Sequence, residues 1–109
     1  MKTKKYNKLV RDNIPAIIKA AGAKGIFKKL NAKDFKKELR SKLVEEAKEL
    51  KKAKGETSML KELADLTEVR NALAAEYNIT PRQIETERRK RQRTRGGFKK
   101  KLFLKKVMK

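Results

Sequence analysis

Apolar residues in the first half of the chain recur at the spacing of an amphipathic α-helix. After Asn31, the apolar positions are Phe35, Leu39, Leu43, Ala47 and Leu50, at intervals of four, four, four and three residues. Such spacing places side chains on one face of a helix. We therefore expect a long helix that begins at Asn31 and ends near Gly55, where a glycine favours termination.

A second segment with helical spacing follows after a short turn. Its cap is Thr57 or Ser58, and its apolar side is formed by Leu60, Leu63, Ala64, Thr67, Leu73 and Ala74, with an end around Tyr77-Asn78. Because only a few residues join the two segments, the sequence predicts an antiparallel helical hairpin as the core of the fold.

Shorter elements flank this hairpin. Before it, Asp12 or Asn13 can cap a short helix that carries Pro15 in its first turn and stops near Gly22. Residues 23–30 form a connector in which 25–27 could be a short strand. After the hairpin, Thr80, Pro81 and Gln83 form a capping-box pattern, which predicts a helix from Pro81 to about Arg93. Gly96-Gly97 ends it, and 98–107 resembles a short strand or an extended arm.

The length of 109 residues suits one all-α domain, 1–109, with a basic C-terminal arm at about 95–109. The core is aliphatic and thin, and thin cores often gain stability by self-association. The chain contains no signal-like apolar run and no stretch approaching the roughly 20 apolar residues of a membrane span. We expect a soluble cytoplasmic protein without a membrane partner.

Charge narrows the choice of function. There are 33 Lys and Arg residues against 13 Asp and Glu, which gives 33 − 13 = +20. Such a balance attracts polyanions such as nucleotides and nucleic acids. The chain has no Cys and no His, so thiol chemistry, disulfides, His-based catalysis and the common zinc sites are excluded.

Two acidic pairs stand out in this basic chain: Glu46-x-x-Glu49 and Glu62-x-x-Asp65. Residues three apart lie on the same side of a helix, so each helix of the hairpin offers two carboxylates. The hairpin turns the two pairs toward each other. Four carboxylates in one place favour a hard cation.

The helical columns also place some of these acids inward. Glu46 continues the column of Leu39 and Leu43, and Glu62 continues a column that includes Leu66. An inward carboxylate needs a proton, a basic side chain or a metal. The alternative to a metal is pairing with lysines, such as Lys42 with Glu46 and Lys61 with Asp65 at i,i+4. Glu45 and Glu68 lie in the same neighbourhood, and their columns are less clearly inward.

These acidic pairs resemble the hallmark of the MazG-like all-α nucleoside triphosphate pyrophosphohydrolases, in which an E-x-x-E pair precedes E-x-x-D. Three other sequence segments add to the resemblance: YNKLVRDNIP at 6–15, ELADL at 62–66 and RGGF at 95–98. Together they resemble the branch related to phosphoribosyl-ATP pyrophosphohydrolase, described as house-cleaning enzymes. The resemblance extends from Tyr6 to about Leu104.

The resemblance implies a helical homodimer that uses Mg²⁺, with Mn²⁺ as the alternative, to cleave the bond between the α- and β-phosphates, releasing a nucleoside monophosphate and pyrophosphate. By the same resemblance, the metal ligands and catalytic residues would be Glu46, Glu49, Glu62 and Asp65. A carboxylate-bound metal can activate water and neutralise phosphate charge, so this chemistry requires neither His nor Cys. From the residues themselves, Lys8, Arg11 and Arg95 are candidates for binding the substrate's phosphates.

The tail departs from that family, whose members are much less basic. From Arg88 to Lys109 there are twelve basic residues and no acid. This favours a second hypothesis, a non-enzymatic nucleic-acid-binding helical module, although the chain lacks an aromatic-rich platform and a recognition-helix motif. A third hypothesis, a purely structural helical dimer, leaves the inward acids unexplained.

Overall fold

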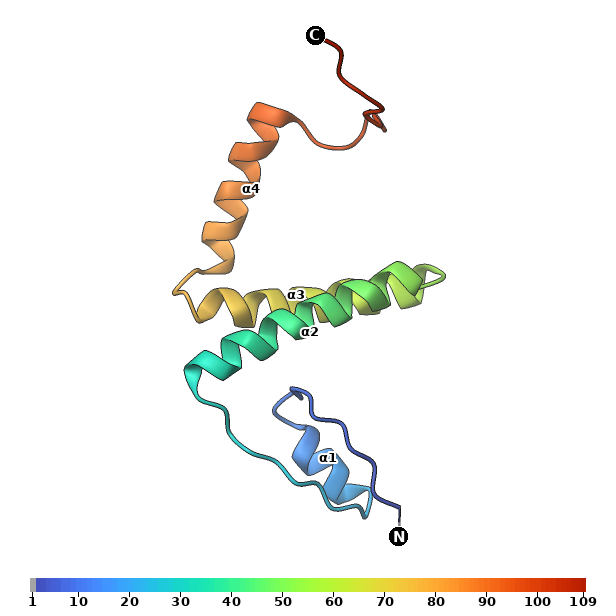
Figure 1. Ribbon diagram of the computed structural model, residues 1–109, viewed down its shortest axis with the longest axis vertical. Coiled ribbons are helices and arrows are strands. Elements are labelled where there is room, and N and C mark those ends of the chain that lie inside the picture. Colours follow the sequence, from blue (N-terminus) through green and yellow to red (C-terminus); the bar gives the residue numbers. More distant parts are fainter. Residues whose placement is uncertain (1) are drawn as a thin grey trace. The chain divides into compact units, whose positions relative to one another are not determined.

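The structure is a computed structural model that describes residues 2–109 (Figure 1). This part of the chain holds four helices and no strand: α1 (Ile14–Ala20), α2 (Ala32–Lys52), α3 (Glu56–Ala75) and α4 (Pro81–Arg95). The expected all-α class is therefore confirmed. The chain divides into two compact units, the first ending at Asn78 and the second spanning Ile79–Lys109. The assignment of 1–109 to one domain stays a prediction.

Helices α2 and α3 pack against each other as the expected hairpin (Figure 1). The reversal between them uses Gly55, whose φ of 84° lies in the left-handed region that favours glycine. Gly55 is also the N-cap of α3, which begins at Glu56. The expectation of a cap at Thr57 or Ser58 is therefore wrong, because the glycine turn is tight enough for the helix to start at once.

The other end of the hairpin is held by polar contacts. Asn31 caps α2, its side chain accepting a hydrogen bond of 2.8 Å from the backbone N–H of Asp34. Beyond the end of α3, the hydroxyl of Tyr77 accepts a hydrogen bond from Arg40. The Nζ of Lys36 lies 4.9 Å from the centre of the Tyr77 ring. These contacts connect the start of α2 to the end of α3.

The core of the hairpin is small. Leu39 is the only buried residue among residues 2–109. Ala47, expected in the same column, is exposed. Successive steps of four residues rotate a column away from its starting face, because four residues turn a helix by about 400°. A step of three from Leu43 restores the direction and leads to Glu46, which takes the inward place expected for Ala47.

The segment before the hairpin contains a helix in the expected place. Pro15 lies in the first turn of α1, and Asn13 occupies the N-cap position without a side-chain cap hydrogen bond. The short strand considered for 25–27 does not form. A strand needs a partner to satisfy its backbone groups, and none of residues 2–109 forms one.

The second unit begins with the expected capping box. The Thr80 hydroxyl accepts a hydrogen bond of 3.1 Å from the Gln83 backbone N–H, and the Gln83 side chain accepts one of 2.8 Å from the Thr80 backbone N–H. Helix α4 ends at Arg95, before Gly96 at a φ of 82°. Residues 101–109 have no regular secondary structure. Of the two expectations for the tail, the strand is wrong and the extended arm stays a prediction.

None of the helices within residues 2–109 is both long enough and apolar enough to span a membrane.

Candidate metal centre

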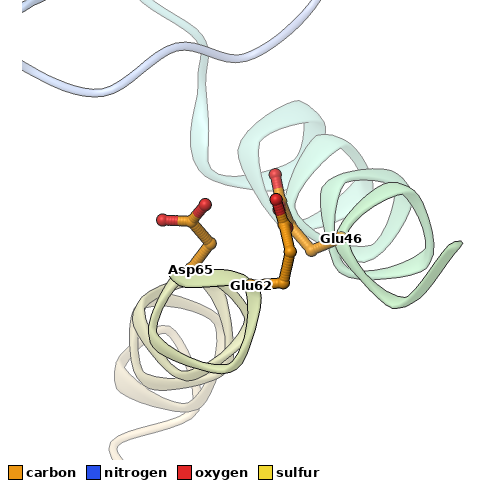
Figure 2. A group of neighbouring side chains, drawn as sticks. All are labelled: Glu46, Glu62 and Asp65. Carbon is orange, nitrogen blue, oxygen red and sulfur yellow. The ribbon is translucent and has the colours of Figure 1, made fainter. Parts of the chain in front are cut away.

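Three of the four predicted carboxylates come together on the hairpin. Glu46 projects from α2, and Glu62 and Asp65 project from neighbouring positions on α3 (Figure 2). One oxygen of each carboxylate can be chosen so that all three oxygens lie within 4.8 Å of one another. The i,i+3 spacing on α3 and the inward place of Glu46 on α2 produce this arrangement.

Two of these carboxylates are largely withdrawn from water. The side chains of Glu46 and Glu62 are 13% and 14% exposed. Placing ionised carboxylates side by side in such an environment is unfavourable, because each loses hydration and repels the other. The hairpin therefore needs a source of positive charge at this point.

Two lysines lie close enough to supply part of that charge. The Nζ of Lys42 is 3.9 Å from Glu46 Oε1, and the Nζ of Lys61 is 3.9 Å from Asp65 Oδ2 and 3.4 Å from Glu62 Oε1. The alternative pairing expected from the sequence is therefore present. Both i,i+4 contacts are at the long limit for an ion pair, and Lys61 is itself exposed, so solvent screens its contribution.

The lysines do not compensate the cluster. The pKa of Glu46 is raised above its usual value, chiefly by burial, then by a hydrogen bond with Glu62, and the nearby charge of Lys42 opposes this only in part. The Oε2 atom of Glu62 is buried and has no hydrogen-bond partner in the described part of the chain. A proton on Glu46 relieves both problems, and so would a cation.

The raised pKa of Glu46 predicts how stability depends on pH in the absence of metal. The folded state keeps the Glu46 proton to a higher pH than the unfolded chain does, so its stabilising contribution is complete below about pH 4.5. That contribution is lost as pH rises through the folded pKa. Glutamine resembles the protonated acid, so we expect Glu46→Gln to raise Tm in EDTA at pH 7. The corresponding gain in the free energy of unfolding is roughly 0.5–1 kcal/mol. Near pH 4.5 the substitution should have little effect.

The measurement is thermal unfolding of the wild type and of Glu46→Gln between pH 4.5 and pH 7. The other ionisable groups are the same in both proteins, so their effect on Tm cancels in the difference. Glu49→Gln is the matched control because Glu49 is exposed on the same helix. A lower Tm for Glu46→Gln at pH 7 would mean that the ion pair with Lys42 outweighs burial.

The segment before α1 also reaches the acidic cluster. Arg11 Nη2 donates a hydrogen bond of 2.9 Å to Asp65 Oδ1. Lys8 Nζ lies 3.9 Å from Glu45 Oε1, and Lys42 also approaches Glu45, at 3.4 Å. The two candidate phosphate-binding residues thus lie beside the hairpin acids. The partner of Arg11 was not foreseen, because residues 54 positions apart show no local spacing signal.

The roles of two other candidate residues are not tested by this cluster. Glu49 is exposed, is not among the three converging carboxylates, and lines a shallow surface pocket that Glu62 also lines. Its role as a metal ligand stays a prediction. Arg95 is the last residue of α4, in the second unit, and its role in phosphate binding also stays a prediction.

The three converging carboxylates fit a small divalent cation. Octahedral Mg²⁺ holds oxygen ligands at about 2.1 Å, so two ligands are about 3.0 Å apart when adjacent and about 4.2 Å apart when opposite. The oxygens of the cluster lie within 4.8 Å of one another, and they would move closer together to bind one ion. The ligands would all be carboxylates, which Mg²⁺ and Mn²⁺ accept readily.

Comparisons of the chain with protein-family models, with curated proteins and with solved structures gave no match.

Proposed function

We propose that the protein is a metal-dependent nucleoside triphosphate pyrophosphohydrolase of the MazG-like kind, using Mg²⁺ or Mn²⁺. The observation that carries the proposal is the shortage of positive charge at Glu46, Glu62 and Asp65, where a buried carboxylate oxygen lacks a partner and a neighbouring pKa is raised. A divalent cation supplies what two lysines and one arginine do not. The sequence resemblance names the reaction that such a site would serve.

The three carboxylates would hold the cation between α2 and α3, with Glu49 as a fourth ligand if its side chain turns inward. The bound cation would polarise the phosphate oxygens of the substrate and lower the pKa of an attacking water. The limited exposure of Glu46 and Glu62 keeps bulk water from competing for this position. The rigid hairpin fixes the spacing of the ligands, which is the part of catalysis that the fold supplies.

Arg11 has a second role in this proposal. Without metal, its guanidinium is engaged by Asp65 at 2.9 Å. A cation bound to Asp65 would replace that interaction and leave the exposed Arg11 side chain available to a phosphate, which guanidinium groups bind in a bidentate manner. Lys8, also exposed, would add a second positive charge on the same side of the cluster. Metal and nucleotide should therefore bind more tightly together than separately.

We also propose that the protein acts as a homodimer through the hairpin. Leu60 on α3 is 68% exposed, and Leu63 on the same helix is exposed as well. Val44 on α2 is likewise exposed. A hairpin with a single buried residue among the described residues, and with apolar side chains exposed to water, has surface to bury against a second copy.

The reaction is tested by measuring pyrophosphate release from a panel of standard and modified nucleoside triphosphates. We expect release with Mg²⁺ or Mn²⁺, none in EDTA, and a nucleoside monophosphate as the second product. Release of inorganic phosphate in place of pyrophosphate would show cleavage at another bond. No product from any nucleotide, together with no thermal stabilisation by either metal, would contradict the proposal.

A further inference from the structure

The second unit carries basic residues of which the proposed reaction uses at most Arg95. Its only acids are Glu85 and Glu87, and all of residues 88–109 are exposed. Twelve basic residues and no acid in that range create a positive field with no compensating charge of its own. A surface of this kind binds an extended polyanion better than a single small nucleotide, because it can neutralise several phosphates at once.

Local ion pairs show which of these charges are free. Glu85 accepts hydrogen bonds from Arg88 at 2.6 Å and from Arg89 at 3.3 Å, and the hydrogen bond from Arg88 is the main cause that lowers the pKa of Glu85 to about 2. These two arginines are therefore partly neutralised within α4. Lys90, Arg91 and Arg93 have no carboxylate within ion-pair distance among residues 2–109, so their charges are available to a ligand.

The arrangement along α4 suits a chain of phosphates. Arg91 and Arg95 are four residues apart, which places them on one face of the helix, about 6 Å apart along its axis. Each guanidinium can hold a phosphate with two parallel hydrogen bonds. Ile79, just before this helix, and Ile84, on it, line a shallow hollow together with Arg88 and Arg91, so apolar surface lies beside the guanidinium groups.

The arm after α4 adds exposed aromatic rings among its lysines. Phe98 and Phe103 are 98% and 88% exposed. Lys99, Lys100 and Lys101 separate them in the sequence. Rings in water next to positive charges are the combination that binds unpaired bases, because bases stack on the rings while the charges hold the backbone.

Other occupants of this surface fit less well. A lipid surface suits the leucines of the arm, but residues 101–109 lack regular secondary structure, and entering hydrocarbon would leave their backbone groups without hydrogen bonds. Helix α4 has arginines around it and no continuous apolar face to insert. A second copy of the unit carries the same charge and would be repelled.

We infer that the second unit, Ile79–Lys109, is a binding surface for single-stranded nucleic acid. Its free cations on α4 hold the phosphates, and Phe98 and Phe103 stack on unpaired bases. This activity is independent of the carboxylate cluster on the hairpin and does not require divalent metal.

The test uses the full chain and a fluorescent single-stranded oligonucleotide of about 20 nucleotides, titrated in EDTA at several salt concentrations. In the triple variant Lys90→Gln, Arg91→Gln, Arg93→Gln, the negative slope of log K against log salt should become less steep by about 2. Each phosphate contact on a single strand contributes about 0.7 to its magnitude. The affinity at low salt should fall at least about tenfold.

A matched variant removes the same charge elsewhere. Lys33, Lys37 and Lys48 are exposed on α2 and form no ion pair among the described residues. Changing these three to Gln should leave the affinity within about twofold, because their charges lie outside the binding surface. If both triple variants lose affinity equally, the protein binds through its net charge alone, and the assignment of the surface is wrong.

The phenylalanines distinguish bases from bare phosphate. Phe98→Ala and Phe103→Ala should each weaken oligonucleotide binding by about fivefold or more, the effect of losing one stacked base. Neither should change the binding of inorganic polyphosphate. Equal affinity of the wild type for single-stranded and duplex DNA, unaffected by either phenylalanine change, would overturn the inference. So would tighter binding to vesicles of phosphatidylglycerol than to the oligonucleotide.

Discussion

Glu62→Gln is expected to reduce metal-dependent pyrophosphate release by roughly a thousandfold or more, the effect of losing several kcal/mol of charge stabilisation in the transition state. Glu62 lies between the other two acids: its carboxylate lies close to that of Glu46, it belongs to the same i,i+3 pair as Asp65, and it holds the buried oxygen that lacks a partner. Glutamine keeps its shape and removes the charge that a cation requires.

The variant should remain folded, because the neutral amide relieves the repulsion between Glu46 and Glu62. We expect its Tm in EDTA to equal or exceed that of the wild type, while the stabilisation by Mn²⁺ disappears. Glu68→Gln is the matched control, since Glu68 is exposed on the same helix and outside the three-carboxylate cluster. A folded Glu62→Gln protein with near wild-type turnover would show that these carboxylates do not hold the catalytic metal.

The same assay decides the place of Glu49. In the structure it is exposed and apart from the other three acids. If its side chain turns inward when metal binds, Glu49→Gln should impair turnover nearly as strongly as Glu62→Gln. A small effect would define a centre with three carboxylates.

The hairpin could be predicted from the sequence because each of its parts has a local cause. The apolar spacing around Leu39 and the glycine turn at Gly55 are both visible within a few residues. The face on which each residue lies was harder to predict, and the prediction was wrong for Ala47. Equal steps of four residues exceed the roughly 3.6 residues of a helical turn, so the predicted column drifts away from the buried face. The correct column, through Glu46, was also the one that indicated a functional residue.

The site was predictable only as far as helical periodicity reaches. Helical periodicity correctly predicted that Glu62 lies beside Asp65 and that Glu46 points toward them. It gave no sign that Arg11 would donate to Asp65, because that contact joins a segment without regular structure to a distant helix. The E-x-x-E spacing also predicted the same role for Glu46 and Glu49. Residues three apart differ by about 60° around the helix axis, which is enough to leave one side chain largely covered and the other exposed.

The second large effect concerns assembly. We expect the wild-type protein to sediment as a dimer and the double variant Leu60→Gln, Leu63→Gln to sediment as a monomer at the same concentration. In a symmetric dimer each substitution occurs twice, so four leucines lose their burial, at about 1.5–3 kcal/mol for each one that is fully covered. Even partial burial amounts to at least about 4 kcal/mol, or roughly a thousandfold in Kd.

Leu102→Gln, Leu104→Gln is the matched control, because these leucines are even more exposed but belong to the arm of the second unit. It should remain dimeric if the hairpin forms the interface, and dissociation of this control alone would place the interface on the arm. Turnover by the monomeric hairpin variant then separates two roles of the dimer. All three converging carboxylates belong to one chain, so metal stabilisation should persist in the monomer. Loss of turnover with metal binding intact would mean that the second copy supplies contacts to the nucleotide.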